Sequence, residues 1–168
     1  YRNFFDAYER EYAGGNSRWD LLDVMRMMYA VCPDALHWPL RDDGQPSFKL
    51  EHLAKANGCF EGEAHEALSD VRSLINIARK VRVAAPKLWQ HCLDLRDKNK
   101  VAGKLALHKN QRILHVSGQF PAAQACTGLM LPLMPHPLIK TRTLAVELRP
   151  EALKLIDYTA EQIERNIF

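Results

Sequence analysis

The stretch AHEALSDVRSLINIARKVRV, residues 64–83, decides the fold of the first half of this chain. Its apolar residues recur at spacings of three and four, which is the pattern of a helix that buries one face. Basic residues gather toward its end, where the helix dipole favours positive charge. We therefore predict one long helix, ended by Ala85-Pro86, with an apolar stripe formed by Leu68, Val71, Leu74, Ile75, Ala78 and Val81.

A second amphipathic helix is predicted upstream, over residues 19–31, from the same spacing of apolar side chains. Asn16 or Ser17 can cap its N-terminus, and Asp20 in the first turn would complement the helix dipole. Pro33 ends this helix, because the residue before a proline avoids the helical conformation.

Between the two helices, residues 32–47 are rich in Pro and contain an Asp-Asp-Gly turn, which predicts a long surface loop. Ser47 is then expected to cap a short helix over residues 49–56. Asn57-Gly58 follows it, and a glycine at this position favours a left-handed helix end.

The second half of the chain changes character after Pro86. A more polar helix is predicted from residue 87 to about residue 100. Short strands are predicted over residues 105–107, 113–116 and 144–148, and helical spacing returns over 150–165. The expected class is α/β (α+β), with a helical half to about residue 85 and a mixed half after it.

Size and composition are those of a globular protein. The 168 residues suffice for one substantial core or two small domains, and 47% of them are apolar while 26% are charged. The net charge of +3 is mildly basic. That balance agrees with a nucleic-acid partner but does not by itself indicate one.

The cysteines indicate a reducing compartment. Cys32, Cys59, Cys92 and Cys126 are widely spaced and form no CxxC pair, so neither a zinc knuckle nor a disulfide framework is supported. We expect four reduced thiols in a cytoplasmic protein. No run of 18 apolar residues and no secretory leader appears, so no membrane association is expected.

His65 and Asp70 are the pair that can carry chemistry. A carboxylate can hold a divalent cation while an imidazole takes the proton from an attacking water. Within one helix the two side chains would lie about 140° apart, so His65 must sit at or before the helix start to share a cleft with Asp70. The alternative is a solvated histidine at a helix start.

Longer segments around this pair resemble bacterial exonuclease I in order and spacing. They are NSRWDLLDVMR (residues 16–26), PSFKLEHLAKANG (46–58), AHEALSDV (64–71) and LHVSG (114–118). The resemblance covers nearly the whole chain. It implies an RNase H-like exonuclease domain, an SH3-like domain and a helical C-terminal domain. On this basis residues 1–85 would be the C-terminal part of the exonuclease domain, mostly its helices, and residues 86–168 the N-terminal part of the SH3-like domain.

The resemblance also implies a function. Exonuclease I is a DEDDh-type enzyme that degrades single-stranded DNA in the 3′→5′ direction during DNA repair and recombination. His65 would be its general base and Asp70 a ligand of one of two Mg²⁺ ions, with Mn²⁺ as an alternative. The family binds the acidic C-terminal tail of single-strand DNA-binding protein in a basic pocket, and the parent protein is expected to be a monomer.

One departure from the family pattern bears on activity. The superfamily holds its two metal ions with four carboxylates, and no strand of this chain bears the expected Asp-x-Glu. The third carboxylate would lie just upstream of the segment that matches Tyr1-Arg2-Asn3-Phe4, and the chain begins without Met. We therefore interpret these residues as an internal fragment, and we predict that they are inactive by themselves.

Candidate DNA contacts lie in the family-like segments. Arg18, Arg26 and Lys49 can hold phosphates, while Trp19 and Phe48 can stack on bases. The alternatives are a solvated helix face for the basic residues and core packing for the two rings.

A basic stretch lies between the two halves, and it suits an acidic peptide that ends in a hydrophobic residue. Its members are Lys87, Arg96, Lys98, Lys100, Lys104, Lys109 and Arg112, of which Arg112 is the one assigned to partner binding. A solvated face is the alternative for the stretch. For the whole chain, the alternatives are a non-catalytic module that binds DNA or the protein tail, and an RNA-trimming member of the superfamily.

Overall fold

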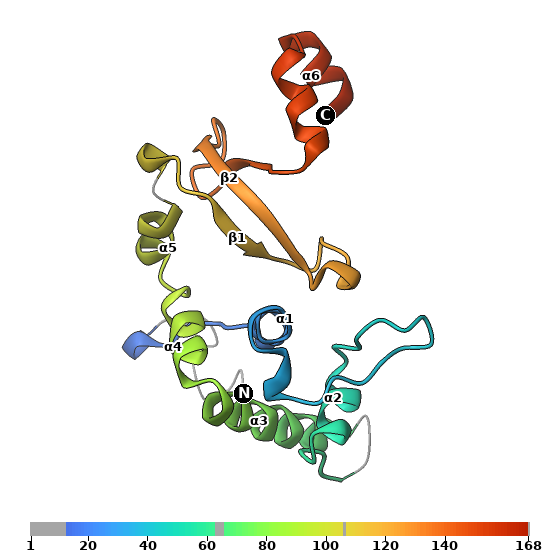
Figure 1. The fold of residues 1–168 in the computed structure, drawn as a ribbon. Helices are drawn as coiled ribbons and strands as arrows, with labels where there is room; N and C mark the ends of the chain where they lie inside the picture. Colours follow the sequence, from blue (N-terminus) through green and yellow to red (C-terminus); the bar gives the residue numbers. More distant parts are fainter. Residues whose placement is uncertain (1–12, 63–65, 106, 168) are drawn as a thin grey trace.

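The computed structural model describes residues 13–62, 66–105 and 107–167. Figure 1 shows a group of helices at one end, a small sheet in the middle and a terminal helix at the other end. The helices are α1 (Leu21–Val31), α2 (Leu50–Ala56), α3 (Ala67–Ala84), α4 (Pro86–Asp94), α5 (Lys98–Leu105) and α6 (Ala160–Ile167). The strands are β1 (Ile113–Val116), β2 (Thr127–Pro135) and β3 (Thr143–Glu147).

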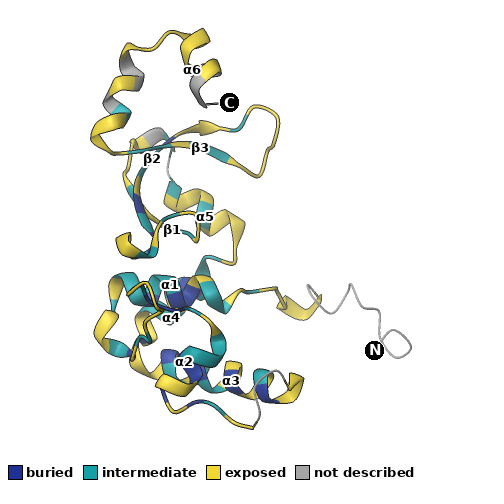
Figure 2. Ribbon diagram, turned by 90° about the vertical axis from the view of Figure 1, so that its right-hand side faces the viewer, coloured by how far each residue is buried: buried dark blue, intermediate teal, exposed yellow. Residues whose placement is uncertain are grey.

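The main core lies among α1, α2, α3 and α4. Buried side chains from each of these helices form one cluster, in which Met28, Leu53, Ile77 and Val81 are almost completely covered. Figure 2 shows that buried residues concentrate in this helical half, whereas the sheet half is mostly exposed or partly buried. Hydrophobic burial therefore stabilises the helices that position the candidate site.

The buried face of α3 differs from the predicted apolar stripe. The core-facing row is Ser69, Ser73, Ile77 and Val81, at strict spacings of four. Most of the predicted stripe is exposed, with Leu68 at 53%, Val71 at 51%, Leu74 at 41% and Ile75 at 43% of its accessible surface. We attribute the difference to the two serines, whose small side chains suit the close packing of α2 on α3.

The helix ends correct the predicted caps. Asp20, rather than Asn16 or Ser17, caps α1, since its carboxylate accepts a hydrogen bond from the Leu22 N–H at 2.8 Å. Ser47 does not cap α2 but makes a 2.8 Å hydrogen bond with Nδ1 of His52. The left-handed end predicted at Gly58 is confirmed, with a φ of 65°.

The helices of the second half are shorter than predicted. The single helix expected over residues 87–100 is two helices, because α4 ends at Asp94 and α5 begins at Lys98. The Asp97 carboxylate accepts a hydrogen bond from the Asn99 N–H at 2.8 Å, which favours this second start. The C-terminal segment is a 3₁₀ run over Pro150–Asp157 followed by α6.

The sheet is antiparallel, in the order β1-β2-β3. The strands predicted over residues 113–116 and 144–148 correspond to β1 and β3, whereas the strand predicted over 105–107 is wrong, because Leu105 ends α5 and Leu107 begins a 3₁₀ turn. The central strand β2 was not predicted. It contains Pro132, which provides no N–H for the ladder, and its register shifts between Pro132 and Met134.

The sheet meets the helical half where β1 approaches α1. All four cysteines are free thiols, as expected. Among the described residues, no helix combines the length and the apolarity that a membrane span requires.

Candidate functional site

The predicted catalytic pair is described only in part. His65 lies outside the described residues, so its position relative to Asp70 stays a prediction. Asp70 lies in the first turn of α3, is partly exposed, and donates its backbone N–H to the Glu66 carbonyl at 3.0 Å. No group of three His, Cys, Asp or Glu side chains in the described part of the chain could hold a metal ion.

Trp19 lies at the start of α1, where it packs against the core. Its ring meets the ring of Trp89 on α4 edge-on, with centroids 4.8 Å apart and an angle of 84° between the planes. This contact fastens the beginning of α1 to α4. Arg18, which precedes Trp19, is exposed.

Phe48 belongs to a second aromatic cluster. Its ring lies 5.7 Å from that of Tyr29 and 5.9 Å from that of Trp38, in edge-on arrangements. Lys49 follows it in sequence and is exposed at the N-terminus of α2. The geometry places Phe48 in packing contacts and leaves Lys49 accessible to an anion.

Arg26 connects the two halves of the chain. From α1, its Nη1 donates to the Asp23 carboxylate at 2.7 Å. The other side of the guanidinium lies against the backbone of Gly118, in the loop between β1 and β2. Burial raises the pKa of the Cys126 thiol in the same loop, and the positive charge of Arg26 lowers it in part.

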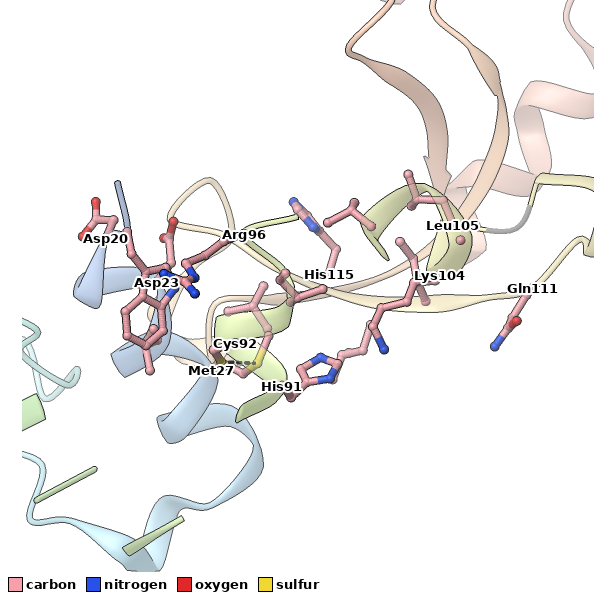
Figure 3. Close-up of a pocket in the computed structure, with 18 of the residues that line it drawn as sticks. Asp20, Asp23, Met27, His91, Cys92, Arg96, Lys104, Leu105, Gln111 and His115 are labelled. Atoms are coloured by element: carbon pink, nitrogen blue, oxygen red, sulfur yellow. Dashed lines mark hydrogen bonds between the residues drawn. The ribbon is translucent and has the colours of Figure 1, made fainter. Parts of the chain in front are cut away.

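A cavity of about 880 Å³ opens between α1, α4, α5 and β1, and we call it the junction cavity. Its basic lining residues are Arg18, Arg96, Lys104 and Arg112, with His91 and His115. Figure 3 shows Arg96 on the side of the cavity where Asp20 and Asp23 lie, and Lys104 on the side of His91. Met27 and Cys92 also line it, and their sulfur atoms lie 3.4 Å apart.

The charge of the junction cavity favours an anionic ligand. Its two carboxylates are already engaged, Asp20 with the first turn of α1 and Asp23 with Arg26. Arg96 is oriented by donating to Oγ of Ser17 at 2.9 Å. The cavity therefore has more positive than negative groups, beside a partly apolar wall. This lining suits a ligand that has carboxylate groups and also an apolar end.

The predicted basic stretch is divided by the fold. Arg96, Lys104 and Arg112 line the junction cavity, whereas Lys87, Lys98, Lys100 and Lys109 do not. Lys100 pairs instead with Asp94 at 2.7 Å, and this hydrogen bond raises the pKa of Lys100 and lowers the pKa of Asp94. Arg112 is exposed at the start of β1, where it can reach a ligand in the cavity.

A second cavity, of about 770 Å³, lies among α1, α2 and α3. Its lining is largely apolar and includes Trp19, Met25, Phe48, Leu74 and Ile77. The exposed apolar side chains of α3, among them Leu68, Val71 and Ile75, form an apolar face beside this cavity.

Sequence reasoning assigned no role to Gly118 or Gly128, although LHVSG, one of the family-like segments, ends at Gly118. Their importance becomes visible only in three dimensions, where Gly118 meets Arg26 and Gly128 meets the ring of Phe120. The family-like spacing was the only signal in the sequence that marked this loop.

Comparison with known proteins gives a consistent result. A model of the exonuclease I SH3-like domain matches residues 96–168. Exodeoxyribonuclease I of Escherichia coli is 38% identical over 168 residues, which is 100% of this chain and 35% of that protein. The enzyme of Haemophilus influenzae is 33% identical over 168 residues, again 100% of this chain and 36% of that protein.

Solved structures of exonuclease I show the same similarity. Escherichia coli exonuclease I in complex with a dA16 oligonucleotide superposes with a TM-score of 0.88 at 38% identity, covering 99% of this chain and 36% of that one. An exonuclease I complex with SSB-Ct superposes with a TM-score of 0.85 at 37% identity, covering 98% and 35%. The chain spans about a third of the length of these relatives. Along its whole length the chain is therefore similar to one part of exodeoxyribonuclease I, and residues 96–168 match that family's SH3-like domain.

Proposed function

We propose that the protein to which these residues belong is a 3′→5′ exonuclease that hydrolyses single-stranded DNA to nucleotides, in the cytoplasm and as a monomer. The observation that carries the proposal is the homology to exodeoxyribonuclease I along all 168 residues, including the similarity to a relative solved with an oligonucleotide. Roles in DNA repair and recombination follow from the same homology.

In this proposal His65 takes the proton from the water that attacks the terminal phosphodiester. Asp70 offers one oxygen ligand of the kind that Mg²⁺ prefers, and Mn²⁺ would suit the same donor. The described residues do not supply the other carboxylates of a two-metal site. The contribution assigned to this chain is therefore one ligand and one base.

DNA binding is assigned to basic groups on the helical half. Arg26 lies between α1 and the Gly118 loop, Lys49 is exposed at the start of α2, and Arg18 lines the junction cavity. Each is proposed to hold a phosphate. Stacking of a base on Trp19 or Phe48 stays a prediction, because each ring already packs against other aromatic rings.

The decisive experiment replaces His65 in the complete protein. We expect His65→Ala to lose cleavage of a 3′-ended oligothymidylate by about 100-fold or more while its affinity for the strand stays within about threefold. His136→Ala is the matched control, since this histidine lies beyond the end of β2 and bonds only to its own loop among described residues. Cleavage that survives in His65→Ala would show that His65 is structural and would refute its assigned role.

We further propose that the junction cavity binds the acidic C-terminal tail of single-strand DNA-binding protein, with Arg112 among its contacts. The basic lining and the partly apolar wall support this, as does a relative solved with SSB-Ct. Arg112→Glu should weaken binding of an acidic peptide with a hydrophobic end by about fivefold to tenfold. Lys98→Glu changes the net charge equally but lies outside the cavity lining, so it should have a smaller effect. Equal losses would contradict the proposed site.

A non-catalytic binding module is the second candidate for these residues taken alone. It is favoured by one observation, namely that the described residues hold no cluster of metal ligands. Under this alternative the basic surfaces of the two halves recruit DNA or the protein tail. Cleavage by the complete protein that depends on His65 would exclude it for the whole enzyme.

A further inference from the structure

The side chain of Arg26 lies directly beside Gly118. A methyl carbon at this position would lie 2.6 Å from Nη2 and 2.8 Å from Cζ of Arg26, well inside van der Waals contact. The backbone of Gly118 does not have the positive φ seen at Gly58 and Gly62. Its conformation would therefore accept any L-residue, and a side chain at this position would instead require the Arg26 guanidinium, the end of a flexible side chain, to move.

The loop that carries Gly118 is held firmly from the sheet side. The Ser117 N–H donates to the Cys126 carbonyl at 2.9 Å, and the Phe120 N–H donates to the Ser117 carbonyl at 3.2 Å. The Phe120 ring covers Gly128 on β2, where a methyl carbon would lie 2.5 Å from its Cζ. Since the loop backbone is anchored on both sides of Gly118, a side chain there would displace the guanidinium rather than the loop.

The guanidinium is also held from the helix side. Nη1 donates to Asp23 at 2.7 Å, and the Arg26 side chain is only 22% exposed. Asp23 and Gly118 thus confine the planar group between α1 and the β1–β2 loop. Among described residues the Arg26 side chain makes no hydrogen bond other than the one to Asp23, so donors remain for a phosphate.

We propose that Gly118 is a positioning residue for Arg26: by lacking a side chain it lets the guanidinium lie across the junction in the orientation that contacts a DNA phosphate. This inference rests on the phosphate contact assigned to Arg26 under the proposed function. It makes DNA affinity depend on how the SH3-like half sits on the helical half, although Gly118 itself has no side chain that could touch the strand.

The test is a double-mutant cycle in the complete protein, with Arg26→Ala, Gly118→Ala and the double variant. The probe is a fluorescent oligothymidylate of about 15 nucleotides, bound in EDTA so that it is not cleaved. Arg26→Ala should weaken binding about tenfold, and Gly118→Ala about threefold to tenfold. In the Arg26→Ala background the space is free, so Gly118→Ala should then change affinity by less than about twofold.

Two further readouts separate positioning from a structural role. Arg26→Ala and Gly118→Ala should each reduce the dependence of log K on log salt concentration by about 0.7, the value expected when one phosphate of a single strand is no longer neutralised. In cleavage assays Gly118→Ala should raise KM and leave kcat unchanged. Gln119→Ala, on an exposed residue of the same loop, is the control and should behave as the unmodified protein.

The outcomes are distinct. If Arg26→Ala weakens binding but Gly118→Ala does not, the inference is overturned while the phosphate contact of Arg26 stands. If Arg26→Ala has no effect on binding, both are overturned. If Gly118→Ala lowers both the melting temperature and the affinity equally in both backgrounds, Gly118 is structural and the inference is overturned. If the double variant recovers the melting temperature that Gly118→Ala alone loses, the steric conflict with Arg26 is supported.

Discussion

Trp19 provides a direct test of whether the aromatic rings near α1 serve packing or base stacking. Replacing Trp19 by Ala removes a ring that is partly buried and edge-on to Trp89 at 4.8 Å. Truncation of a fully buried Trp costs about 3–5 kcal/mol, so for this partly buried ring we expect about 2–3 kcal/mol. About 0.5–1.5 kcal/mol of that loss would come from the pairing of the two rings.

The partner ring supplies the control, because Trp89→Ala breaks the same contact from α4. If Trp19 serves packing, both variants should lower the free energy of unfolding in urea, and the double variant should lose less than the sum of the two. Affinity for a single-stranded oligonucleotide, measured well below the unfolding transition, should then change by less than about threefold in either variant.

Base stacking predicts a different pattern. A base stacked on an aromatic ring contributes about 1–3 kcal/mol, or roughly a factor of five to a hundred in affinity. If Trp19→Ala loses about tenfold or more in affinity while Trp89→Ala keeps it, the packing interpretation is refuted. Trp19→Phe would then restore part of the binding, since a smaller ring still offers a face.

Three further predictions concern the helix start, a buried thiol and the fragment. Asp20→Ala should lower the free energy of unfolding by about 1 kcal/mol, measured by urea unfolding, because the Leu22 N–H loses its cap; Asp20→Asn should keep most of it. Burial raises the pKa of Cys92 above its ordinary value of 9.0. The stabilising effect of keeping this thiol neutral is therefore complete below pH 9.0 and is lost as the pH rises through the raised pKa. As the pH rises above 9.0, Cys92→Ala should lose less free energy of unfolding than the unmodified protein. An equal loss would show that ionisation of the Cys92 thiol is not the cause. Residues 1–168 by themselves should release no nucleotides from single-stranded DNA with Mg²⁺, and Mg²⁺-dependent release would overturn that prediction.

The helices could be predicted where their signals are local. The apolar spacing of residues 19–31 and the left-handed glycine at position 58 both lead to the observed elements. The face that α3 buries could not be predicted in this way. Apolar character favours the row of Leu68 and Ile75, yet the helix buries Ser69 and Ser73, because which row meets α2 is decided by packing between helices.

The central strand β2 shows a second limit of local signals. Its two prolines and Gly128 resemble loop punctuation, and prolines are normally excluded from the middle of a sheet. The structure accommodates Pro132 at a register shift, where the ladder does not need its N–H. Pairing with β1 and β3 on both sides therefore overrides the local preference. That pairing cannot be predicted from the residues of β2 alone.

The site residues divide in the same way. Arg26 could be proposed from a family-like segment and Arg112 from the basic stretch, but nothing near Arg26 in the sequence relates it to Gly118, which lies on the other side of the junction. Under the proposed function Arg26 needs open space beside it as well as a positive charge in order to reach a phosphate. In a sequence, such space shows only as a residue without a side chain. Gly118 has ordinary backbone geometry, so the usual reason for a glycine does not apply to it. The contact with Arg26 is what remains to explain that glycine, and under the proposed function it makes the phosphate contact of Arg26 depend on how the sheet packs on the helices.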